Sequence, residues 1–140
     1  TAEGSQFSAS HTLEYSFSAF AAAQFARALG KTNEQTRLLH SARGWEQLYD
    51  PETGFIRPRD LAGRFIPEFN PRKAWVGFQE GNAWQYLFHQ MQDLQDMNVK
   101  LGGDDAFEAK LDLCFSTKTD GKNEDIGQYW HGNEPDQHYL

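Results

Sequence analysis

The chain has 140 residues, the size of one ordinary domain. Its 13 Lys and Arg against 20 Asp and Glu give a net charge of −7, which argues against nucleic acid and anionic membrane surfaces as partners. The apolar runs are too short for a membrane-spanning helix, and the single cysteine, Cys114, excludes an internal disulfide and a cysteine-based zinc site.

The composition favours helices over sheets. Aromatic residues make up 14% of the chain, whereas Ile and Val, which dominate buried strands, are scarce. Leu, Ala, Gln and Glu are plentiful and suit helices. We therefore expect a mainly all-α fold.

Residues 1–9 are small and polar, and we expect them to form a flexible extension before a domain at 10–140. A first helix is predicted over residues 12–29, with Gly30 as its left-handed cap. Its expected inward face consists of Leu13, Phe17, Phe20, Ala21, Phe25, Ala28 and Leu29. Thr32 and Gln35 predict a capping box for a second helix, which should stop before Pro51.

Residues 55–67 predict a short β-hairpin or extended loop limited by prolines. A third helix is expected from about residue 82 to 101, and a fourth from 104 to 115 after Gly102 and Gly103. The two helical hairpins repeat 72 residues apart, at Leu29 and Leu101, which indicates stacked αα-hairpins of a solenoid or a closed toroid. Two hairpins cannot close a toroid, so this reading predicts an incomplete domain.

A first candidate site surrounds Glu80, which is followed by a glycine, two amides and two aromatic residues. In one interpretation, Glu80 only interacts with the positive end of the following helix. In the other, burial against Trp75 and Trp84 raises the pKa of its carboxyl and makes it a general acid. Asn82 and Gln85 could then hydrogen-bond hydroxyl groups.

A second candidate site lies in residues 127–138, where Asn133, Glu134 and Asp136 supply oxygen atoms suited to a hard cation such as Ca²⁺. His131 and His138 are seven residues apart, which is a weak zinc spacing. The alternative is a polar loop before a helix that begins at Pro135.

These two segments resemble motifs of glycoside hydrolase family 92, the calcium-dependent exo-α-mannosidases. Residues 80–86 (Glu-Gly-Asn-Ala-Trp-Gln-Tyr) and 131–135 (His-Gly-Asn-Glu-Pro) carry the resemblance, and residues 12–15, 28–31, 49–55 and 57–58 add to it in family order. The resemblance implies part of an (α/α)6 toroid that removes terminal α-linked mannose from glycans with inversion and Ca²⁺ assistance.

The same resemblance implies roles for individual residues. Glu80 corresponds to the general acid, and Asn133 and Glu134 fall in the calcium-binding region. Contact with the sugar is implied for Trp84, Asn82, Gln85, Gln128, Tyr129 and His131. An inverting enzyme fits this chemistry, because it needs an acid on the leaving oxygen and a base for the attacking water.

The sequence also departs from the family. It lacks the family's general-base motif and its N-terminal β-sandwich domain, and it has Ser18-Ala19 and Met91-Gln92 where the family has acids and Pro-His. Gln128-Tyr129 argues for a linkage other than α-1,2. We therefore expect an inactive internal fragment whose partners are a mannose-containing glycan and the remainder of the same catalytic domain. Its exposed apolar seams, such as 87–101, should favour self-association. The resemblance implies a periplasmic or secreted enzyme, and the rival interpretation is a non-catalytic glycan-binding or scaffold domain.

Overall fold

The computed structural model of the chain describes residues 6–116 and 129–139. Helices dominate these residues, and a single two-stranded antiparallel hairpin accompanies them there, so the predicted mainly all-α class is confirmed. Within the described ranges, no helix is both long and apolar enough to span a bilayer. Within the predicted extension 1–9, the first helix already begins at Ser8 and buries Ala9, and residues 1–5 lie outside the described residues.

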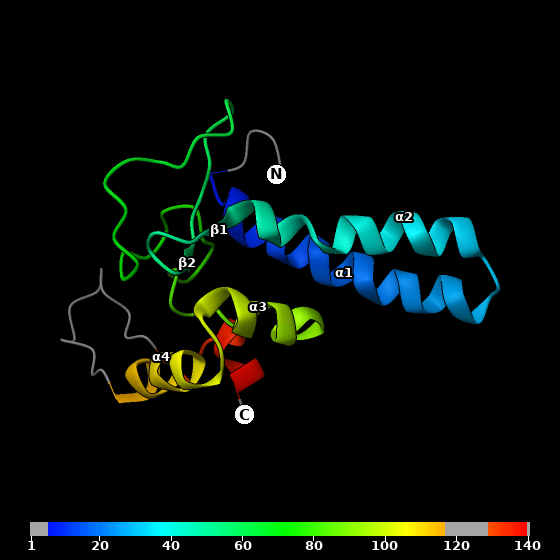
Figure 1. Ribbon diagram of the computed structural model, residues 1–140. Coiled ribbons are helices and arrows are strands. Elements are labelled where there is room, and N and C mark those ends of the chain that lie inside the picture. Colours follow the sequence, from blue (N-terminus) through cyan, green and yellow to red (C-terminus); the bar gives the residue numbers. More distant parts are fainter. Residues whose placement is uncertain (1–5, 117–128, 140) are drawn as a thin grey trace.

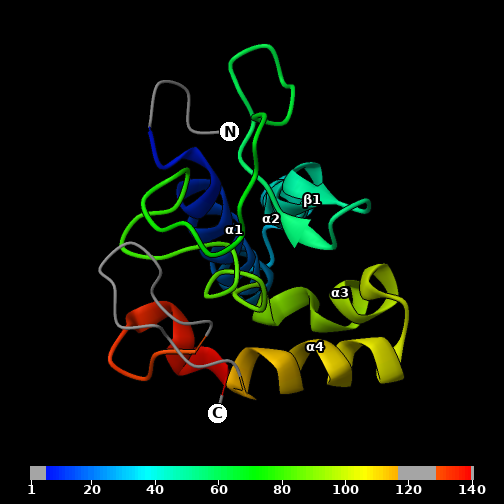
Figure 2. The ribbon, with the colours of Figure 1, turned by 90° about the vertical axis from the view of Figure 1, so that its left-hand side faces the viewer.

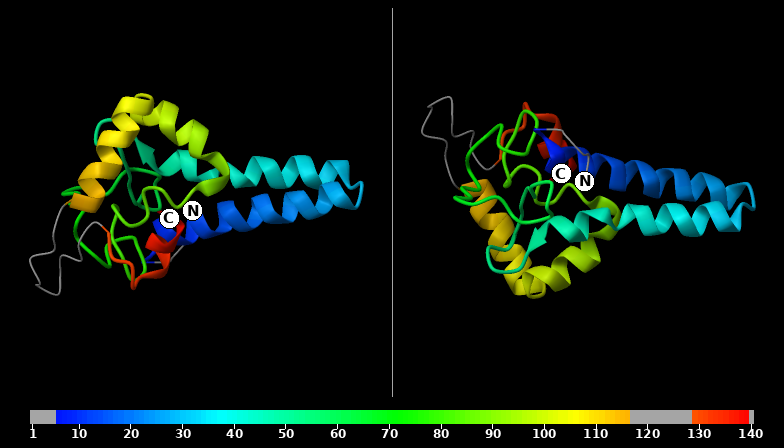
Figure 3. Two further views of the ribbon diagram at one scale, coloured as in Figure 1. Left: turned by 90° about the horizontal axis from the view of Figure 1, so that it is seen from below. Right: turned by 90° about the horizontal axis from the view of Figure 1, so that it is seen from above.

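Helices α1 (Ser8–Ala28) and α2 (Thr32–Ala42) form an antiparallel hairpin that projects from the rest of the molecule (Figures 1 and 3). Gly30 adopts the predicted left-handed conformation, with φ of 68°, and its N–H bonds to the carbonyl of Arg27 at 3.0 Å. The predicted capping box is wrong. Thr32 is already helical, and the N-cap residue Lys31 makes no side-chain cap bond.

The buried face of α1 differs from the predicted one. Leu13 is fully buried, but Phe17 and Phe25 are exposed, Phe25 by 67%. Small side chains take the inner positions instead, namely Ala9, Thr12, Ser16, Ala23 and Ala26. The hydroxyls of Thr12 and Ser16 bond to carbonyls one turn back, at 2.7 and 2.8 Å, which satisfies them inside the protein. Small side chains occupy the buried positions of α1 because they let neighbouring backbone lie close to the helix.

After α2, the chain does not continue as helix to residue 50. It forms the 3-10 helix η1 (Gly44–Leu48) and then strands β1 (Tyr49–Asp50) and β2 (Phe55–Ile56), which pair Tyr49 with Ile56. The Asp50 carboxylate closes the turn between them, accepting hydrogen bonds from Glu52 N–H and the Thr53 hydroxyl. The predicted hairpin at 55–67 is therefore partly correct: one strand belongs to β1–β2, and a single bridge, Arg59 to Phe65, closes the following loop.

The predicted helix over 82–101 is only half present. Residues 82–90 form successive turns, followed by the 3-10 helix η2 (Met91–Asp93) and the helix α3 (Leu94–Leu101). Every residue from 81 to 90 is buried, so no face of this segment meets solvent. A surface helix would expose one face, and tertiary burial therefore overrides the helical pattern.

Helix α4 (Asp104–Ser116) follows α3 across Gly102, whose φ of 110° confirms the predicted stop. The 3-10 helix η3 (Glu134–Tyr139) lies near the C-terminal end of the chain. Seen along the helical hairpin, α3 and α4 lie on one side of it and the loop around residue 60 on the other (Figure 2). The toroid itself stays a prediction.

One core joins these elements. Trp45, Leu48, Ile56, Phe78, Leu87 and Met97 are fully buried or nearly so in a single cluster. The Trp45 indole donates to Asp93 at 2.7 Å, which fastens η2 to η1, and the Tyr49 hydroxyl donates to the carbonyl of Lys100 at 2.7 Å, which fastens α3 to β1. The expected exposed seam at 87–101 is partly confirmed: Leu87 and Met97 are buried in this core, whereas Met91 and Leu94 are exposed. Self-association stays a prediction.

Candidate active site

Glu80 lies in a tight turn with its side chain exposed. Its φ of 54° is left-handed, a conformation that costs a non-glycine residue about 1–2 kcal/mol. Gly81 makes the turn possible, because a Cβ there would lie 3.0 Å from Gln85 Oε1 and 3.0 Å from the Tyr86 ring. Strained backbone held by its surroundings is common at functional sites. The turn, rather than a helix end, therefore sets the position of this carboxylate.

Asn82 holds the turn from inside. Its side chain is fully buried, and its Oδ1 accepts hydrogen bonds from the N–H groups of Trp84, at 3.0 Å, and Gln85, at 3.2 Å. Its Nδ2 donates to the carbonyl of Arg72 at 3.1 Å. Asn82 thus supports the segment that carries Glu80.

Two hydrogen bonds join the two sequence motifs. Asn133 Nδ2 donates to the carbonyl of Glu80 at 2.7 Å, and Gln85 Nε2 donates to Asp136 Oδ2 at 3.1 Å. Asp136 is fully buried, and this burial raises the pKa of its carboxyl to about 6, against the effect of the bonds that it accepts. Residues about 50 positions apart are therefore held as one unit.

A cavity of about 430 Å³ opens between these motifs and α1. Three carboxylates line it, from Glu14, Glu80 and Glu134, and its other lining residues are Ser10, His11, Phe17, Gln79, Tyr86, His89, Asn133 and Pro135. Its volume lies in the range of small-molecule sites. The combination of acidic oxygens with aromatic rings suits a polyhydroxylated ligand.

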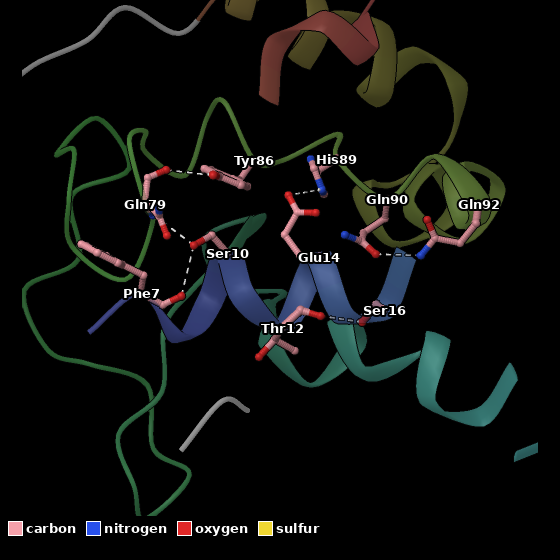
Figure 4. Close-up of polar contacts among 10 residues, drawn as sticks. All are labelled: Phe7, Ser10, Thr12, Glu14, Ser16, Gln79, Tyr86, His89, Gln90 and Gln92. Atoms are coloured by element: carbon pink, nitrogen blue, oxygen red, sulfur yellow. Dashed lines mark hydrogen bonds and ion pairs between the residues drawn. The ribbon is translucent and has the colours of Figure 1, made fainter. Parts of the chain in front are cut away.

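Glu14, His89 and Tyr86 form one side of this cavity. Glu14 Oε1 lies 3.2 Å from His89 Nε2, and the two side chains point toward each other (Figure 4). The Tyr86 hydroxyl donates to the carbonyl of Gln79 at 2.8 Å. Burial, together with the charges of Glu14, Glu80 and Glu134, raises the pKa of Tyr86 to about 12, so its phenol stays a neutral donor.

The predicted environment of Glu80 is wrong. We expected burial against Trp75 and Trp84, but Glu80 is exposed, Trp75 is 52% exposed, and Trp84 lies in the core. The Trp84 ring packs edge-on against Phe55, with centroids 4.8 Å apart. The reason is the absent helix: turns at 82–90 direct the indole inward, away from the carboxylate.

The other predicted sugar-binding residues do not line the cavity. Trp84, Asn82 and Gln85 are buried and make contacts inside the protein, and their sugar contact stays a prediction. Tyr129 bonds through its hydroxyl to His131 Nδ1 at 2.8 Å, outside the cavity lining. Gln128 lies outside the described residues.

Asn133 and Glu134, the predicted metal ligands, both line the cavity. Since Asn133 Nδ2 is bound to Glu80, the amide oxygen is the atom left for a cation, and Glu134 offers an exposed carboxylate. Their oxygen chemistry fits a hard cation, which takes six to eight such ligands. No group of three His, Cys, Asp or Glu in the described ranges is arranged to hold a metal, so these residues form at most part of a site.

Sequence reasoning missed Glu14, His89 and Tyr86 as cavity residues. Glu14 was noticed only within a motif of the first helix, and His89 was placed on a predicted helix that is absent. Only the fold brings residues 14 and 89 together. Nothing in the sequence pattern indicated this pairing.

Comparison with known proteins gives consistent results. The family model described as "Glycosyl hydrolase family 92 catalytic domain" matches residues 1–140. A comparison with curated proteins found no significant match. Among solved structures, a family GH92 α-mannosidase from Bacteroides thetaiotaomicron superposes with a TM-score of 0.80 and 37% identity, and covers 90% of this chain.

A structure of that enzyme in complex with mannoimidazole gives a TM-score of 0.81 at 32% identity over 90% of this chain. The family GH92 inverting mannosidase from the same organism gives 0.80 at 29% identity over 91%. The present chain spans only 16%, 18% and 19% of the lengths of these three structures.

Proposed function

Because the chain belongs to glycosyl hydrolase family 92, we propose that it forms part of an inverting exo-α-mannosidase that removes terminal α-linked mannose from glycans. The observation that carries this proposal is the cavity that Glu80 shares with Asn133 and Glu134. It is supported by two structurally similar proteins: one is an α-mannosidase with a structure in complex with mannoimidazole, and the other is an inverting mannosidase.

In this proposal, Glu80 is the general acid. Its carboxyl donates a proton to the glycosidic oxygen as the bond to the anomeric carbon breaks, and water attacks that carbon from the opposite face. A base must take the proton of this water from a position about 6.5–9.5 Å from the acid. In this proposal the base comes from a part of the catalytic domain outside these residues, which span only 16–19% of the lengths of the similar structures. The isolated chain should therefore be inactive.

Asn133 and Glu134 would hold Ca²⁺, which binds and orients the sugar hydroxyls when present. The bond from Asn133 Nδ2 to the carbonyl of Glu80 couples this region to the acid. The two residues would thus fix the sugar relative to the proton donor. The remaining ligands would come from elsewhere in the protein or from water.

The role of Glu80 is tested by Glu80→Gln in the full-length protein. We expect a fall in kcat of about 10²–10⁴-fold on a mannobioside, and a much smaller fall on a dinitrophenyl mannoside, whose leaving group needs no proton. Glu68→Gln is the matched control, because Glu68 is also an exposed glutamate with left-handed backbone, φ 53°, but does not line the cavity.

Equal losses on both substrates would refute the assignment of Glu80 as the acid. Mannoside binding by unaltered full-length protein without any cleavage would instead favour a glycan-binding domain.

The role of Glu134 is tested by calcium titration in a calorimeter. Glu134→Ala should abolish saturable binding by the full-length protein, whereas Glu108→Ala, an exposed change on α4, should leave it intact. Retained binding in the first variant would contradict the assignment.

On the family resemblance we also propose a periplasmic or secreted enzyme, which cell fractionation would test.

A further inference from the structure

We infer that Glu14 binds a hydroxyl group of the sugar in the cavity, and that His89 is the positioning residue that holds its carboxylate for this purpose. The inference rests on the proposed function and adds a substrate-binding residue to it. It comes from a helix that the two recognised motifs do not include.

The first support is the position of Glu14. It lies on α1, a rigid element of 21 residues, whereas Glu80 and Glu134 lie on a turn and at the start of η3. Its side chain is 53% exposed and lines the cavity. Helix-borne groups keep their geometry better than groups on loops.

The second support is that the two carboxylate oxygens of Glu14 have different roles. Glu14 Oε1 pairs with His89 Nε2 at 3.2 Å, which leaves Oε2 to accept a hydrogen bond from a ligand. Ionised carboxylates are the stronger acceptors for hydroxyl groups. Glu14 Oε2 can therefore accept a hydrogen bond from a sugar hydroxyl.

The third support is the way in which His89 is held. It is only 5% exposed, and its ring packs on Tyr86 with centroids 5.5 Å apart, while Tyr86 stacks on Phe78 at 5.4 Å. The ring thus belongs to the core and cannot follow Glu14 into solvent. Because the buried His89 already holds the Glu14 side chain, that side chain loses little further conformational entropy when a ligand binds.

A purely structural role explains less. A contact between a half-exposed carboxylate and a histidine adds little to stability. The pair also lines the same cavity as Glu80, Glu134 and the Tyr86 ring. Glu14 therefore shares the space of the proposed acid and metal ligand rather than a separate part of the surface.

The test uses the full-length protein with Glu14→Gln and Glu14→Ala, and α-mannosides that lack one hydroxyl at a time. Loss of a hydrogen bond to a charged group predicts that Glu14→Ala lowers kcat/KM about tenfold to a hundredfold on the complete mannoside. On the one deoxy analogue that lacks the bound hydroxyl, the same variant should lose threefold or less. Glu14→Gln can keep its contact with His89 and should lose less than Glu14→Ala.

The control is Glu34→Gln, an exposed change in the first turn of α2, which should behave as unaltered protein on every substrate. Thermal unfolding of each variant shows whether the fold is kept. Activity on α-mannosides with the same loss on all deoxy analogues, or with no loss at all, would overturn the role of Glu14 alone. An unaltered protein that neither binds nor cleaves any α-mannoside would overturn the proposed function, and the present inference with it.

Discussion

Among the glycines that the structure describes, Gly77 is the one at which an added methyl group should destabilise the protein most. An added Cβ would lie 2.0 Å from Pro58 Cγ and 2.6 Å from Pro58 Cβ, and the φ of 80° is left-handed. The Gly77 carbonyl also accepts hydrogen bonds from the N–H groups of Ala9, at 3.0 Å, and Ser10, at 3.2 Å, which anchor the start of α1. Left-handed strain costs about 1–2 kcal/mol and forced overpacking about 1–3 kcal/mol. Gly77→Ala should therefore lower the free energy of unfolding by about 2–5 kcal/mol.

Gly63→Ala separates the two contributions. Gly63 has nearly the same φ, 78°, but nothing lies within 4 Å of its added Cβ, so only the strain of about 1–2 kcal/mol should appear. Urea unfolding of both variants, followed by circular dichroism at 222 nm, measures the difference. If Gly77→Ala proved no less stable than Gly63→Ala, the close contact with Pro58 would not constrain the protein and the reasoning would fail.

Three further changes probe the site and its support. Asn133→Ala removes the bond to the Glu80 carbonyl and should cost about 1–3 kcal/mol of unfolding free energy, measured by urea denaturation; an unchanged midpoint would refute the coupling of the two motifs. Burial raises the pKa of the Asp50 carboxyl, but hydrogen bonds, chiefly from Arg57, outweigh it and hold that pKa below 3.8, so its stabilisation is present above pH 3.8 and is lost as the pH falls through the folded-state value. Asp50→Asn should therefore lower stability at neutral pH and flatten the acid limb of a stability–pH curve, and an acid limb as steep as before would contradict this. Finally, the Tyr86 phenol should ionise near pH 12, and Tyr86→Phe should remove that phase from an absorbance titration, whereas a curve identical to that of the unaltered protein would assign the phase to another tyrosine.

Local signals predicted the parts of the fold that local chemistry decides. The glycines at 30 and 102 end their helices in the left-handed conformation, because no other residue adopts it as cheaply. The pattern failed where packing decides. Phe25 was expected inside and is exposed, since the small side chains of Ala23 and Ala26 occupy the buried positions in that part of α1. The segment 82–90 looked helical but is buried on all sides.

The candidate site shows the same division. Glu80, Asn133 and Glu134 could be chosen from the sequence, because each lies in a short motif of chemically distinctive residues, and the structure places all three on one cavity. The pairing of Glu14 with His89 could not be foreseen, because it depends on how α1 crosses the turns before α3. The surroundings of Glu80 were mispredicted for the same reason.

The hydrogen bonds that build the cavity join residues far apart in the sequence, so the cavity forms only when distant parts of the chain meet. The bond from Asn133 to Glu80 closes 53 residues, and that from the Gln79 N–H to the Ser10 hydroxyl closes 69. The α1–α2 hairpin needs only a three-residue connection and can form early, whereas long closures slow folding. In a refolding experiment, helical signal should thus appear before the cavity is complete, and a newly made chain would pass through a helical stage in which Glu80 and Asn133 are not yet joined.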